Sequence, residues 1–600
     1  MQTTVLRGAP SIWAASRSSF APASPTSCLT EPIGHDLRIG AWRPPSLQRS
    51  LRLALGLLAL GAGASSNPLR AQTTVAQYAV TTGTATLGST LTATGGDLTD
   101  GDVYKPTIAG ATALERDALY VTGSATLALV DGAVVSVQND HALTALLRVG
   151  YPEGGTGTLT IATGATLSVG QASNSANFEI GVGQGSSGTV TQTGGDVRVY
   201  GSANVGVDGG AGSYNLSGGT MTLSSGLYSL GLDRTANATA SQGTLHLSGS
   251  AQLTVLDGSL VIGDSDAAGH QGTGVLTQTG GTLTIGTGAL YVGAAGDGTY
   301  NLAGGTLAVG GSGLQVRHGG GAAQGASHFN LGGGTIQVVG SDLATDVDAT
   351  LVSGTASKID TNGLNATFSG TFTGTNAQLV KIGAGNLALT GAANAIDSFF
   401  VTGGKVNQTT GSLISYEIGV GSGAGSTASY TMSSGSLLAA SGTPPSLVGG
   451  QASTLRIGDF GGTGVFDQTG GTVTVNGSLN LGNQGGHGTY NLSAGTLTLQ
   501  SSGQSTLGRT NGSSASSGGS TGALHLSGTG VLNVADTATL VLSNWYPTSG
   551  IAMGTGVLTQ TGGTLAVAPA ARLVLTGLGD GTYNLDAGTL QIGGSSLLAT

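Results

Sequence analysis

Apolar and polar residues alternate with a period of two over many short stretches of this chain. In residues 282–285, Thr-Leu-Thr-Ile, the apolar side chains fall on one side of an extended backbone and the threonine hydroxyls fall on the other. This is the pattern of a strand with one buried face. Glycine pairs separate such stretches and supply the positive φ angles that sharp corners need. The pattern predicts short strands joined by tight turns.

One block of sequence recurs along the chain. It consists of an apolar residue, any residue, an apolar residue or glutamine, any residue, a glycine pair or its equivalent, and then Thr-Leu-any-apolar. The copies begin at Val190, Tyr214, Leu245, Leu276, Tyr300 and Phe329, and again at Tyr430, Phe466, Tyr490, Leu524, Leu558 and Tyr583. The order QTGG, YNL, LHLSG, QTGG, YNL occurs in both series, which indicates a duplicated segment. Less regular copies begin at Tyr120 and Leu159.

A third short strand usually follows each block, as in residues 259–263 and 289–293. Three strands, two tight corners and one variable loop make one turn of a β-solenoid, here called a rung. A single rung cannot bury its apolar face, so neighbouring rungs must stack on it. Roughly 27 residues per rung predict about 20 rungs. A β-sandwich is the competing fold, although its strands would be longer and its internal similarity less regular.

Composition narrows the class of protein. The chain has 600 residues, of which 111 are glycine and 8% are charged, whereas ordinary globular chains have about 7% glycine and about 25% charge. A helical enzyme is therefore disfavoured. Collagen is excluded because glycine does not recur at every third residue and only 13 prolines are present. Disorder fits poorly because 38% of the residues are hydrophobic.

The first 71 residues differ in composition from the rest. Seven of the 19 basic residues and seven of the 13 prolines lie here. Arg49 precedes an apolar run, residues 51–60, which small residues follow. This order is that of a secretory signal peptide with an extended n-region, and the run is too short to span a bilayer as a helix. Cleavage after Ala64 and cleavage after Ala71 both fit, and a buried core helix is the alternative.

The remaining 529 residues would carry 12 basic and 27 acidic side chains, a net charge of −15. Nucleic-acid binding is disfavoured because it requires clustered Lys and Arg against the phosphates. The single cysteine, Cys28, lies in the segment that would be removed. A disulfide framework and thiolate metal sites are therefore excluded from the mature chain.

Three acidic clusters are candidates for catalysis or metal binding. They are Asp97, Asp100 and Asp102; Asp264, Asp266 and His270; and Asp342, Asp346 and Asp348. A glycosidase needs two carboxylates held about 5 to 10 Å apart, and a Ca²⁺ site needs six or more oxygen ligands. Because these clusters occur in glycine-rich segments with few basic neighbours, we interpret them as solvated loops.

Histidine and glutamine positions also follow the repeat. The histidines after residue 71 show no metal-binding spacing; they are His141, His246, His270, His318, His328, His487 and His525. His246 and His525 occupy the same repeat position, which predicts an outward side chain. Four glutamines stand where other copies carry leucine: Gln192, Gln278, Gln468 and Gln560. If this position faces inward, each amide must be hydrogen-bonded, because an unpaired buried amide costs roughly 1 to 3 kcal/mol.

The segments GTGVLTQTGGTL, residues 272–283, and GTYNLAGGTL, residues 298–307, resemble repeats of bacterial autotransporter passengers and related large exported β-strand repeat proteins. The resemblance extends over approximately residues 119–600. It implies a right-handed parallel β-helix displayed on, or released from, the surface of a Gram-negative cell. Autotransporters end in a membrane β-barrel, whereas this sequence stops inside a repeat. We expect a truncated chain or a translocator encoded elsewhere.

The expected organisation is a signal peptide over 1–71, an N-terminal capping segment over 72–118, β-helix repeats over 119–340 and 414–600, and divergent rungs over 341–413. The expected function is that of an exported structural or adhesin-like protein, with surface glycans or other cells as partners. No enzymatic activity, cofactor, metal or catalytic residue is assigned. The alternatives are a β-helical carbohydrate-active lyase or hydrolase, and a self-assembling surface protein.

Overall fold

The chain divides into two units, Met1–Arg70 and Ala71–Thr600. A computed structural model describes part of the second unit, and the predicted signal peptide lies outside the described residues. The described residues are 78–80, 84–87, 90–93, 97–98, 118–121, 125–137, 145–173, 175–234, 239–265, 272–316, 325–440, 453–500, 504–510, 519–535, 537–545, 553–576, 579–594 and 597–598.

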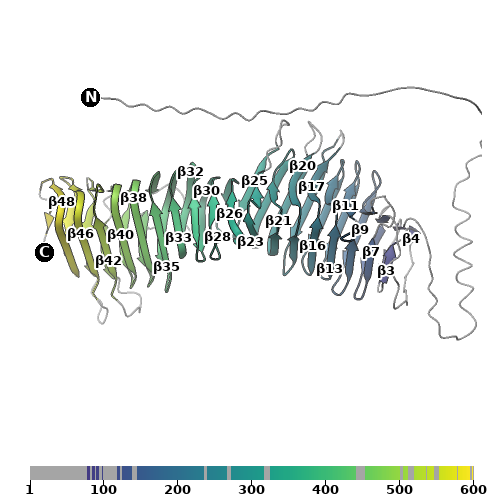
Figure 1. The fold of residues 1–600 in the computed structure, drawn as a ribbon, viewed down its shortest axis with the longest axis horizontal. Coiled ribbons are helices and arrows are strands. Elements are labelled where there is room, and N and C mark those ends of the chain that lie inside the picture. The colour runs from purple at the N-terminus through teal and green to yellow at the C-terminus, as the bar shows by residue number, and fades with distance from the viewer. Residues whose placement is uncertain are drawn as a thin grey trace, which may run out of the picture. The chain divides into compact units, whose positions relative to one another are not determined.

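The described residues form β-strands in two sheets and contain no helix (Figure 1). The first sheet has ten strands: β1 (Tyr78–Val80), β4 (Asp97–Leu98), β5 (Ala118–Val121), β8 (Ala145–Val149), β11 (Ala176–Val182), β14 (Ala203–Val207), β17 (Leu227–Asp233), β20 (Ser259–Ser265), β22 (Leu290–Val292) and β24 (Leu314–Gln315).

The second sheet has 39 strands. Up to residue 311 they are β2 (Thr84–Leu87), β3 (Thr90–Ala93), β6 (Ala125–Leu129), β7 (Val134–Val137), β9 (Thr156–Ile161), β10 (Thr166–Val169), β12 (Ser187–Gln192), β13 (Asp196–Tyr200), β15 (Ala211–Leu216), β16 (Thr220–Ser225), β18 (Gln242–Leu247), β19 (Gln252–Val255), β21 (Thr273–Ile285) and β23 (Asp297–Gly311). The next are β25 (Ser327–Leu331), β26 (Thr335–Thr345), β27 (Ala349–Leu351), β28 (Ala356–Asp360), β29 (Ala366–Phe368), β30 (Phe372–Ile382), β31 (Asn386–Leu389), β32 (Ala393–Val401), β33 (Gly403–Gln408), β34 (Ser412–Ser422), β35 (Thr427–Met432) and β36 (Ser436–Ala439). The last are β37 (Thr454–Asp459), β38 (Thr463–Val475), β39 (Ser478–Asn483), β40 (His487–Leu499), β41 (Gln504–Thr510), β42 (Thr521–Leu526), β43 (Val531–Val534), β44 (Thr539–Val541), β45 (Asn544–Trp545), β46 (Thr555–Val567), β47 (Arg572–Val574), β48 (Asp580–Ile592) and β49 (Leu597–Leu598).

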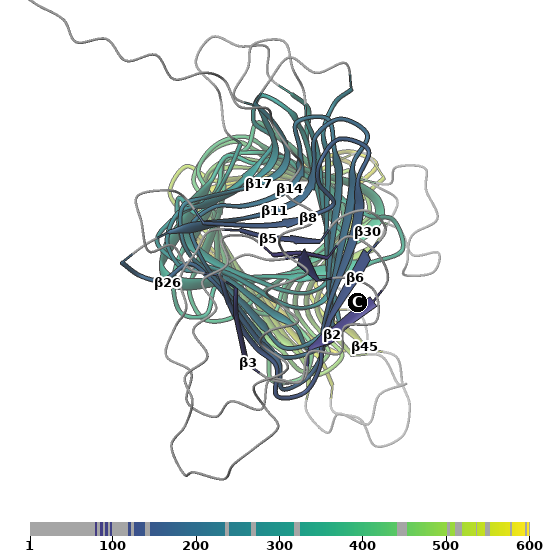
Figure 2. The ribbon, with the colours of Figure 1, turned by 90° about the vertical axis from the view of Figure 1, so that its right-hand side faces the viewer.

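Each rung contributes one strand to each of three parallel ladders. In one rung the chain passes through β11, β12 and β13, and these pair in parallel with β14, β15 and β16 of the next rung. We call the positions of β11, β12 and β13 side 1, side 2 and side 3. Figure 2 looks along the stack and shows the strands around a central core. The all-β fold of parallel strands that the sequence predicts is therefore confirmed, and its form resembles a β-helix.

The alternation of side chains matches the predicted strand faces. Leu283 is fully buried and contacts the core, whereas the neighbouring Thr284 is partly exposed. The same two positions repeat in register through the stack, from Leu253 to Leu283 and on to Leu307. The core is therefore a set of inward columns, in which each apolar side chain packs between its equivalents one rung away.

The glutamines of the repeat face inward and are hydrogen-bonded, as the burial cost requires. Gln278 is fully buried, and its Nε2 donates to the carbonyl oxygens of Gly281 at 3.2 Å and Thr306 at 3.0 Å. Its Oε1 accepts from the hydroxyl of Tyr300, one rung on, at 2.6 Å. Four other pairs share this contact: Gln192 with Tyr214, Gln408 with Tyr430, Gln468 with Tyr490 and Gln560 with Tyr583. A glutamine rung is therefore matched to a tyrosine rung above it.

Glycine is required at the corner between side 1 and side 2. Gly181 has a φ of 65°, and a Cβ placed on it would overlap the carbonyl oxygen of Ala211. A Cβ on Gly212 would in turn overlap the backbone of Ile180 and Gly206. Two backbone segments thus touch at this corner, and only residues without a side chain allow it. We call Gly181 and its equivalents the crossing glycines.

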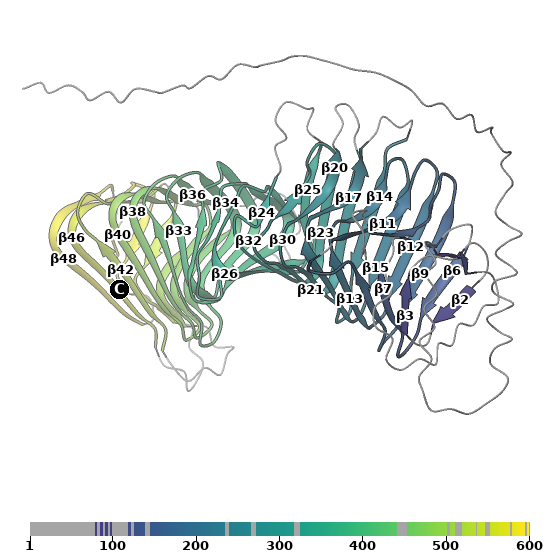
Figure 3. The ribbon, with the colours of Figure 1, turned by 45° about the vertical axis from the view of Figure 1, so that its right-hand side comes forward.

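Residues 341–413, which lack the repeat signature, keep all three ladders but shift the strand types between sides. The side 2 ladder passes from β25 through β27, β30, β32 and β34 to β36 and β38 (Figure 3). At β36 and β38 it holds the Thr-Val-Thr-Val type of strand, which occupies side 3 in the first series. In the second series each type of strand is therefore shifted by one side. The type that occupies side 3 in the first series lies on side 2, and the other two types are shifted in the same direction.

Substitution to aspartate tests the face assignment. We expect Leu283→Asp to cost more than about 3 kcal/mol, because it buries a carboxylate with no partner. Thr284→Asp is the matched control and should change stability by no more than roughly 0.5 kcal/mol. Because contacts in a stack of rungs are local, limited proteolysis should detect damage only near residue 283. Equal sensitivity of the two variants would contradict the assignment.

A double-mutant cycle tests the glutamine and tyrosine pair. Tyr300→Phe leaves the Oε1 atom of Gln278 unpaired in the core, so we expect a loss of about 1 to 3 kcal/mol. Adding Gln278→Leu to that variant should recover part of the loss, because neither side chain then has an unmet polar group at this contact. Urea unfolding measures Tyr300→Phe, Gln278→Leu and the double variant against the unaltered chain. Strictly additive effects would show that the hydrogen bond does not couple the rungs.

Candidate functional site

The outward positions of side 1 form a row that becomes buried along the stack. We call this the outer row; its members follow one another in register and are Tyr120, Arg148, Glu179, Asn204, Ser229 and Val261. Tyr120 is partly exposed and the Arg148 side chain is 18% exposed, but Glu179 is only 1% exposed. Charged and polar side chains are thus held on a sheet face that is largely covered.

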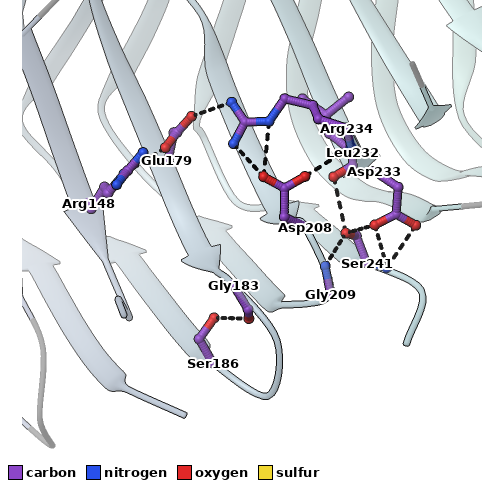
Figure 4. Close-up of polar contacts among 10 residues, drawn as sticks. All are labelled: Arg148, Glu179, Gly183, Ser186, Asp208, Gly209, Leu232, Asp233, Arg234 and Ser241. Atoms are coloured by element: carbon purple, nitrogen blue, oxygen red, sulfur yellow. Dashed lines mark hydrogen bonds and ion pairs between the residues drawn. The ribbon is translucent and has the colours of Figure 1, made fainter. Parts of the chain in front are cut away.

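Glu179 is the centre of an ion-pair network that spans four rungs (Figure 4). Its Oε2 atom lies 2.7 Å from Nε of Arg148, and its Oε1 atom lies 3.1 Å from an Nη atom of Arg234. Arg234 also contacts Oδ2 of Asp208 through its second Nη atom, at 2.9 Å, and through Nε, at 3.1 Å. The ion pairs therefore link Arg148 to Glu179, Glu179 to Arg234 and Arg234 to Asp208, with the two arginines in the outer rungs and the two carboxylates between them.

The network is held in place by its surroundings. Burial lowers the pKa of Arg234, but Glu179 and Asp208 outweigh burial and raise that pKa overall. The backbone N–H of Arg234 also donates to Oδ1 of Asp208 at 2.9 Å. Dehydrating the carboxylate of Glu179 costs several kcal/mol, which two guanidinium partners offset. Because arginine stays protonated at neutral pH, the network suits binding better than proton transfer.

Side chains next to the network fix the turns that cover the sheet. Ser241 donates its hydroxyl to Asp233 and accepts from the backbone N–H of Gly209 at 2.9 Å (Figure 4). Ser186 donates to the carbonyl oxygen of Gly183 at 2.7 Å. These bonds join residues of neighbouring rungs, or of one turn, and keep the covering backbone close to the outer row.

A groove of about 600 Å³ lies beside the network. Its lining includes Arg148, Tyr151, Glu153, Gly183, Asp208 and Arg234. The Tyr151 ring lies under the guanidinium of Arg148, with 4.4 Å between the guanidinium carbon and the ring centre. The same ring stacks against Tyr120 with 5.6 Å between ring centres. The groove therefore combines an aromatic wall with charged groups of both signs.

In the second series a residue of opposite charge occupies the position that is equivalent to Glu179. Arg456 stands two residues before the crossing glycine Gly458, as Glu179 stands two residues before Gly181. Its Nη1 atom lies 2.8 Å from Oε1 of Glu417 and 3.5 Å from Oδ2 of Asp459. The duplicated rungs therefore share the position of a charged side chain but not its sign.

Burial dominates the titration of the acidic groups around Arg456. It raises the pKa of Asp459 to about 6, against the opposing effect of Arg456 and of hydrogen bonds from Phe460 and Asn483. Burial also raises the pKa of Glu417 and of Asp397. Glu417 and Asp459 share the Arg456 guanidinium, and Asp397 adds to the rise in the pKa of Glu417. The cluster therefore retains protons at a higher pH than exposed carboxylates do.

Sequence reasoning placed Asp264 in a solvated loop, and this is wrong. Asp264 lies in β20 with only 3% of its surface exposed. Its Oδ2 atom accepts from the hydroxyl of Ser229 at 2.7 Å, and its Oδ1 atom accepts from the backbone N–H of Ser265 at 2.9 Å. The strand runs further than the apolar pattern indicates, because these bonds satisfy the carboxylate. Asp266 and His270 lie outside the described residues.

The cluster around residue 342 consists of exposed carboxylates that contact other rungs. Asp342 lies in β26 rather than in a loop, and it accepts from the backbone N–H and the side-chain amide of Asn365. These bonds lower the pKa of Asp342. Asp348 accepts from the backbone N–H of Thr371 at 2.6 Å, and Asp346 accepts from that of Val316 at 3.3 Å.

These three carboxylates therefore cap separate backbone groups and do not converge on one point. In the first acidic cluster, Asp97 is placed only as part of β4, and Asp100 and Asp102 lie outside the described residues.

The histidines behave as the repeat predicts. His246 and His525 take outward positions in register with Thr277 and Thr559. His246 contacts the hydroxyl of Thr279 at 3.3 Å. His328 and His487 are exposed, whereas His141, His270 and His318 lie outside the described residues. Within the described part of the chain, no group of three or more His, Cys, Asp or Glu side chains is arranged to hold a metal ion.

Lys381 is a buried cation that sequence reasoning missed. It is fully buried at an inward position, in register with Ile359 and Val401. Its Nζ donates to the carbonyl oxygens of Ile382, Gly383 and Gly403 at 2.8 to 2.9 Å. Burial lowers its pKa to about 8, against the opposing effect of Asp360. The signal available in the sequence was its alternation with the buried residues 377 and 379.

No protein-family model, curated protein or solved structure matches this chain. In the described part of the chain there is also no helix that is long and apolar enough to cross a membrane.

The cluster around Arg456 predicts a stability that depends on pH. The pKa of Asp459 is about 6 in the folded rungs, whereas an unfolded aspartate titrates near about 3.9. Between about pH 4 and pH 6 the folded rungs hold a proton that the unfolded chain has released. The free energy of opening these rungs should therefore fall as the pH rises through this interval.

Asp459→Asn should reduce that slope by up to about 1.4 kcal/mol per pH unit. The slope should not vanish, because the raised pKa values of Glu417 and Asp397 act in the same direction. Hydrogen exchange of residues 455–484, corrected for the intrinsic exchange rate, measures the opening. An identical slope in both proteins would contradict the assignment.

Proposed function

We propose that the chain is an exported, non-catalytic structural or adhesin-like protein of the Gram-negative cell surface or the extracellular medium, built as a right-handed parallel β-helix. The proposal rests on the observation that buried polar groups and exposed carboxylates form hydrogen bonds to neighbouring rungs. Carboxylates, amides and the ammonium of Lys381 bond to neighbouring rungs, as in the contacts of Asp342 and Gln278. Such groups serve the stacking of rungs, which is what a long passive scaffold requires.

The right-handed coil is supported by a general rule of chain topology. Connections between parallel strands of one sheet are right-handed in about 98% of cases, because strands twist to the right. Here parallel neighbours such as β12 and β15 are joined through the other two sides of the rung. The resemblance of residues 272–283 and 298–307 to autotransporter passengers agrees with that hand.

Export is supported by residues 49–71 and by the absence of cysteine after Cys28. The basic, apolar and small-residue order is that of a cleaved signal. A chain that crosses membranes unfolded gains from having no cysteine, since no disulfide can form on the way. The partners proposed for the exported protein are surface glycans or other cells.

A carbohydrate-active enzyme is the alternative of a different class. It would need two carboxylates that face one substrate about 5 to 10 Å apart. Asp264 is instead buried and accepts from Ser229 and Ser265, and Asp342 accepts from the backbone N–H of Asn365. These contacts favour the non-catalytic role. The second alternative is self-assembly of the protein into a surface structure.

The proposal is tested by expressing the full chain in a Gram-negative host and measuring the intact mass of the exported protein. We expect the mature protein to begin at Ser65 or Gln72, because cleavage follows small residues. A variant with Leu57→Arg and Leu58→Arg interrupts the apolar run and should remain unprocessed inside the cell. An exported protein that begins before Leu51, or equal processing of the variant, would contradict the export step.

A further inference from the structure

We propose that the groove beside Glu179 binds an uncharged oligosaccharide that lies along the stack across four rungs. The groove takes residues from four successive turns of the chain: Tyr151 and Glu153 follow β8, Gly183 follows β11, Asp208 follows β14 and Arg234 follows β17. Its volume of about 600 Å³ falls in the range of ligand sites in proteins. A groove that crosses rungs suits an extended chain better than a compact ligand.

The presence of both signs of charge selects the chemistry of the ligand. Arg148 and Arg234 present guanidinium groups, and Glu153 and Asp208 present carboxylates, within one groove. An anionic chain would meet the two carboxylates, and a cationic chain would meet the two guanidinium groups, so a chain of either sign would be repelled by part of the groove. A hydroxyl group both donates and accepts hydrogen bonds. Neighbouring sugar hydroxyls can therefore donate to Asp208 and accept from Arg234 at the same time.

The polar groups are accessible and already oriented. The side chains of Arg148, Asp208 and Arg234 are 18%, 21% and 34% exposed. The two oxygen atoms of Glu179 hold both guanidinium groups, and Arg234 in turn holds Asp208. A site whose side chains are held before binding loses little conformational entropy when the ligand arrives.

Tyr151 supplies the apolar surface that a sugar ring needs. Its ring contacts both Tyr120 and the guanidinium of Arg148, which restricts its rotation, and Tyr151 stays partly exposed. Tyrosine offers an apolar body together with a polar tip. It can therefore contact the C–H groups of a sugar while its neighbours bind the hydroxyls.

The stacking of rungs does not by itself require this groove. In the second series the positions of Arg148 and Tyr151, counted from the crossing glycine, are occupied by Gly419 and Ser422. The position of Asp208 is occupied there by Gln484. Because equivalent rungs stack without these side chains, we infer that they serve binding.

This inference rests on the proposed function, since an exported adhesin-like protein is what would meet a glycan outside the cell. Its test does not depend on export, because it uses the purified full chain. Isothermal titration with cellohexaose, xylohexaose and maltohexaose gives the affinity for neutral chains. Hexagalacturonate and a chitosan hexamer are the anionic and cationic probes, and hexaglutamate and hexalysine are the peptide probes.

We expect at least one neutral hexasaccharide to bind more tightly than every charged probe. Tyr151→Ala should weaken its binding by about tenfold or more, as truncation of a buried aromatic contact does. The matched control is Tyr200→Ala, because Tyr200 also carries an arginine, Arg198, against its ring but lies away from the groove. That variant should bind within about twofold of the unaltered chain. Circular dichroism and limited proteolysis confirm that both variants are folded.

Three results would overturn the proposal: no binding of any neutral probe, tighter binding of a charged probe, or equal weakening by both substitutions. Release of shortened products from a bound hexasaccharide would support the ligand class and contradict the non-catalytic function. A failure of export with intact binding would contradict the localisation alone. The two proposals can therefore fail separately.

Discussion

Parallel pairing between successive rungs is the constraint on which the rest of the structure depends. Each strand bonds to its equivalents one rung before and one rung after, as β12 bonds to β9 and β15. An inward residue is therefore always packed between the residues at the same position of its neighbours. Large and small side chains must be matched along a column, as in the stacked rings of Tyr430, Phe466 and Tyr490.

The same constraint explains why polar residues can enter the core. A column repeats at a fixed distance, so a glutamine in one rung meets a defined atom in the next. Gln468 finds the hydroxyl of Tyr490 at 2.6 Å and a carbonyl oxygen at Thr496. Lys381 finds three carbonyl oxygens at a corner where the backbone turns. Buried hydrogen bonds of this kind favour one rung order over another, because a misplaced rung leaves them unpaired.

Much of the fold could be predicted from the sequence, because alternation and repetition are local signals. The faces of Leu283 and Thr284 and the inward glutamines follow from the period of two and the burial cost of an amide. The ionic site could not be predicted in this way. Glu179 occupies an outward position and is nevertheless buried, and its partner Arg234 stands 55 residues further along the chain. The repeat pattern did not indicate the buried Gln408, because its rung lacks the glycine pair of the repeat.

The shift of strand types in residues 341–413 has a geometric consequence for the two halves of the stack. The strands that carry Glu179 and Arg456 are equivalent in sequence, but the first lies on side 1 and the second continues the ladder of side 3. Adding or removing whole rungs between these two strands would change the distance between them. It would leave the angle between them around the axis nearly constant. Adding one strand would instead rotate the distal half by a third of a turn. Residues 341–413 thus set the angle between the two charged surfaces around the axis of the stack, independently of the distance between them.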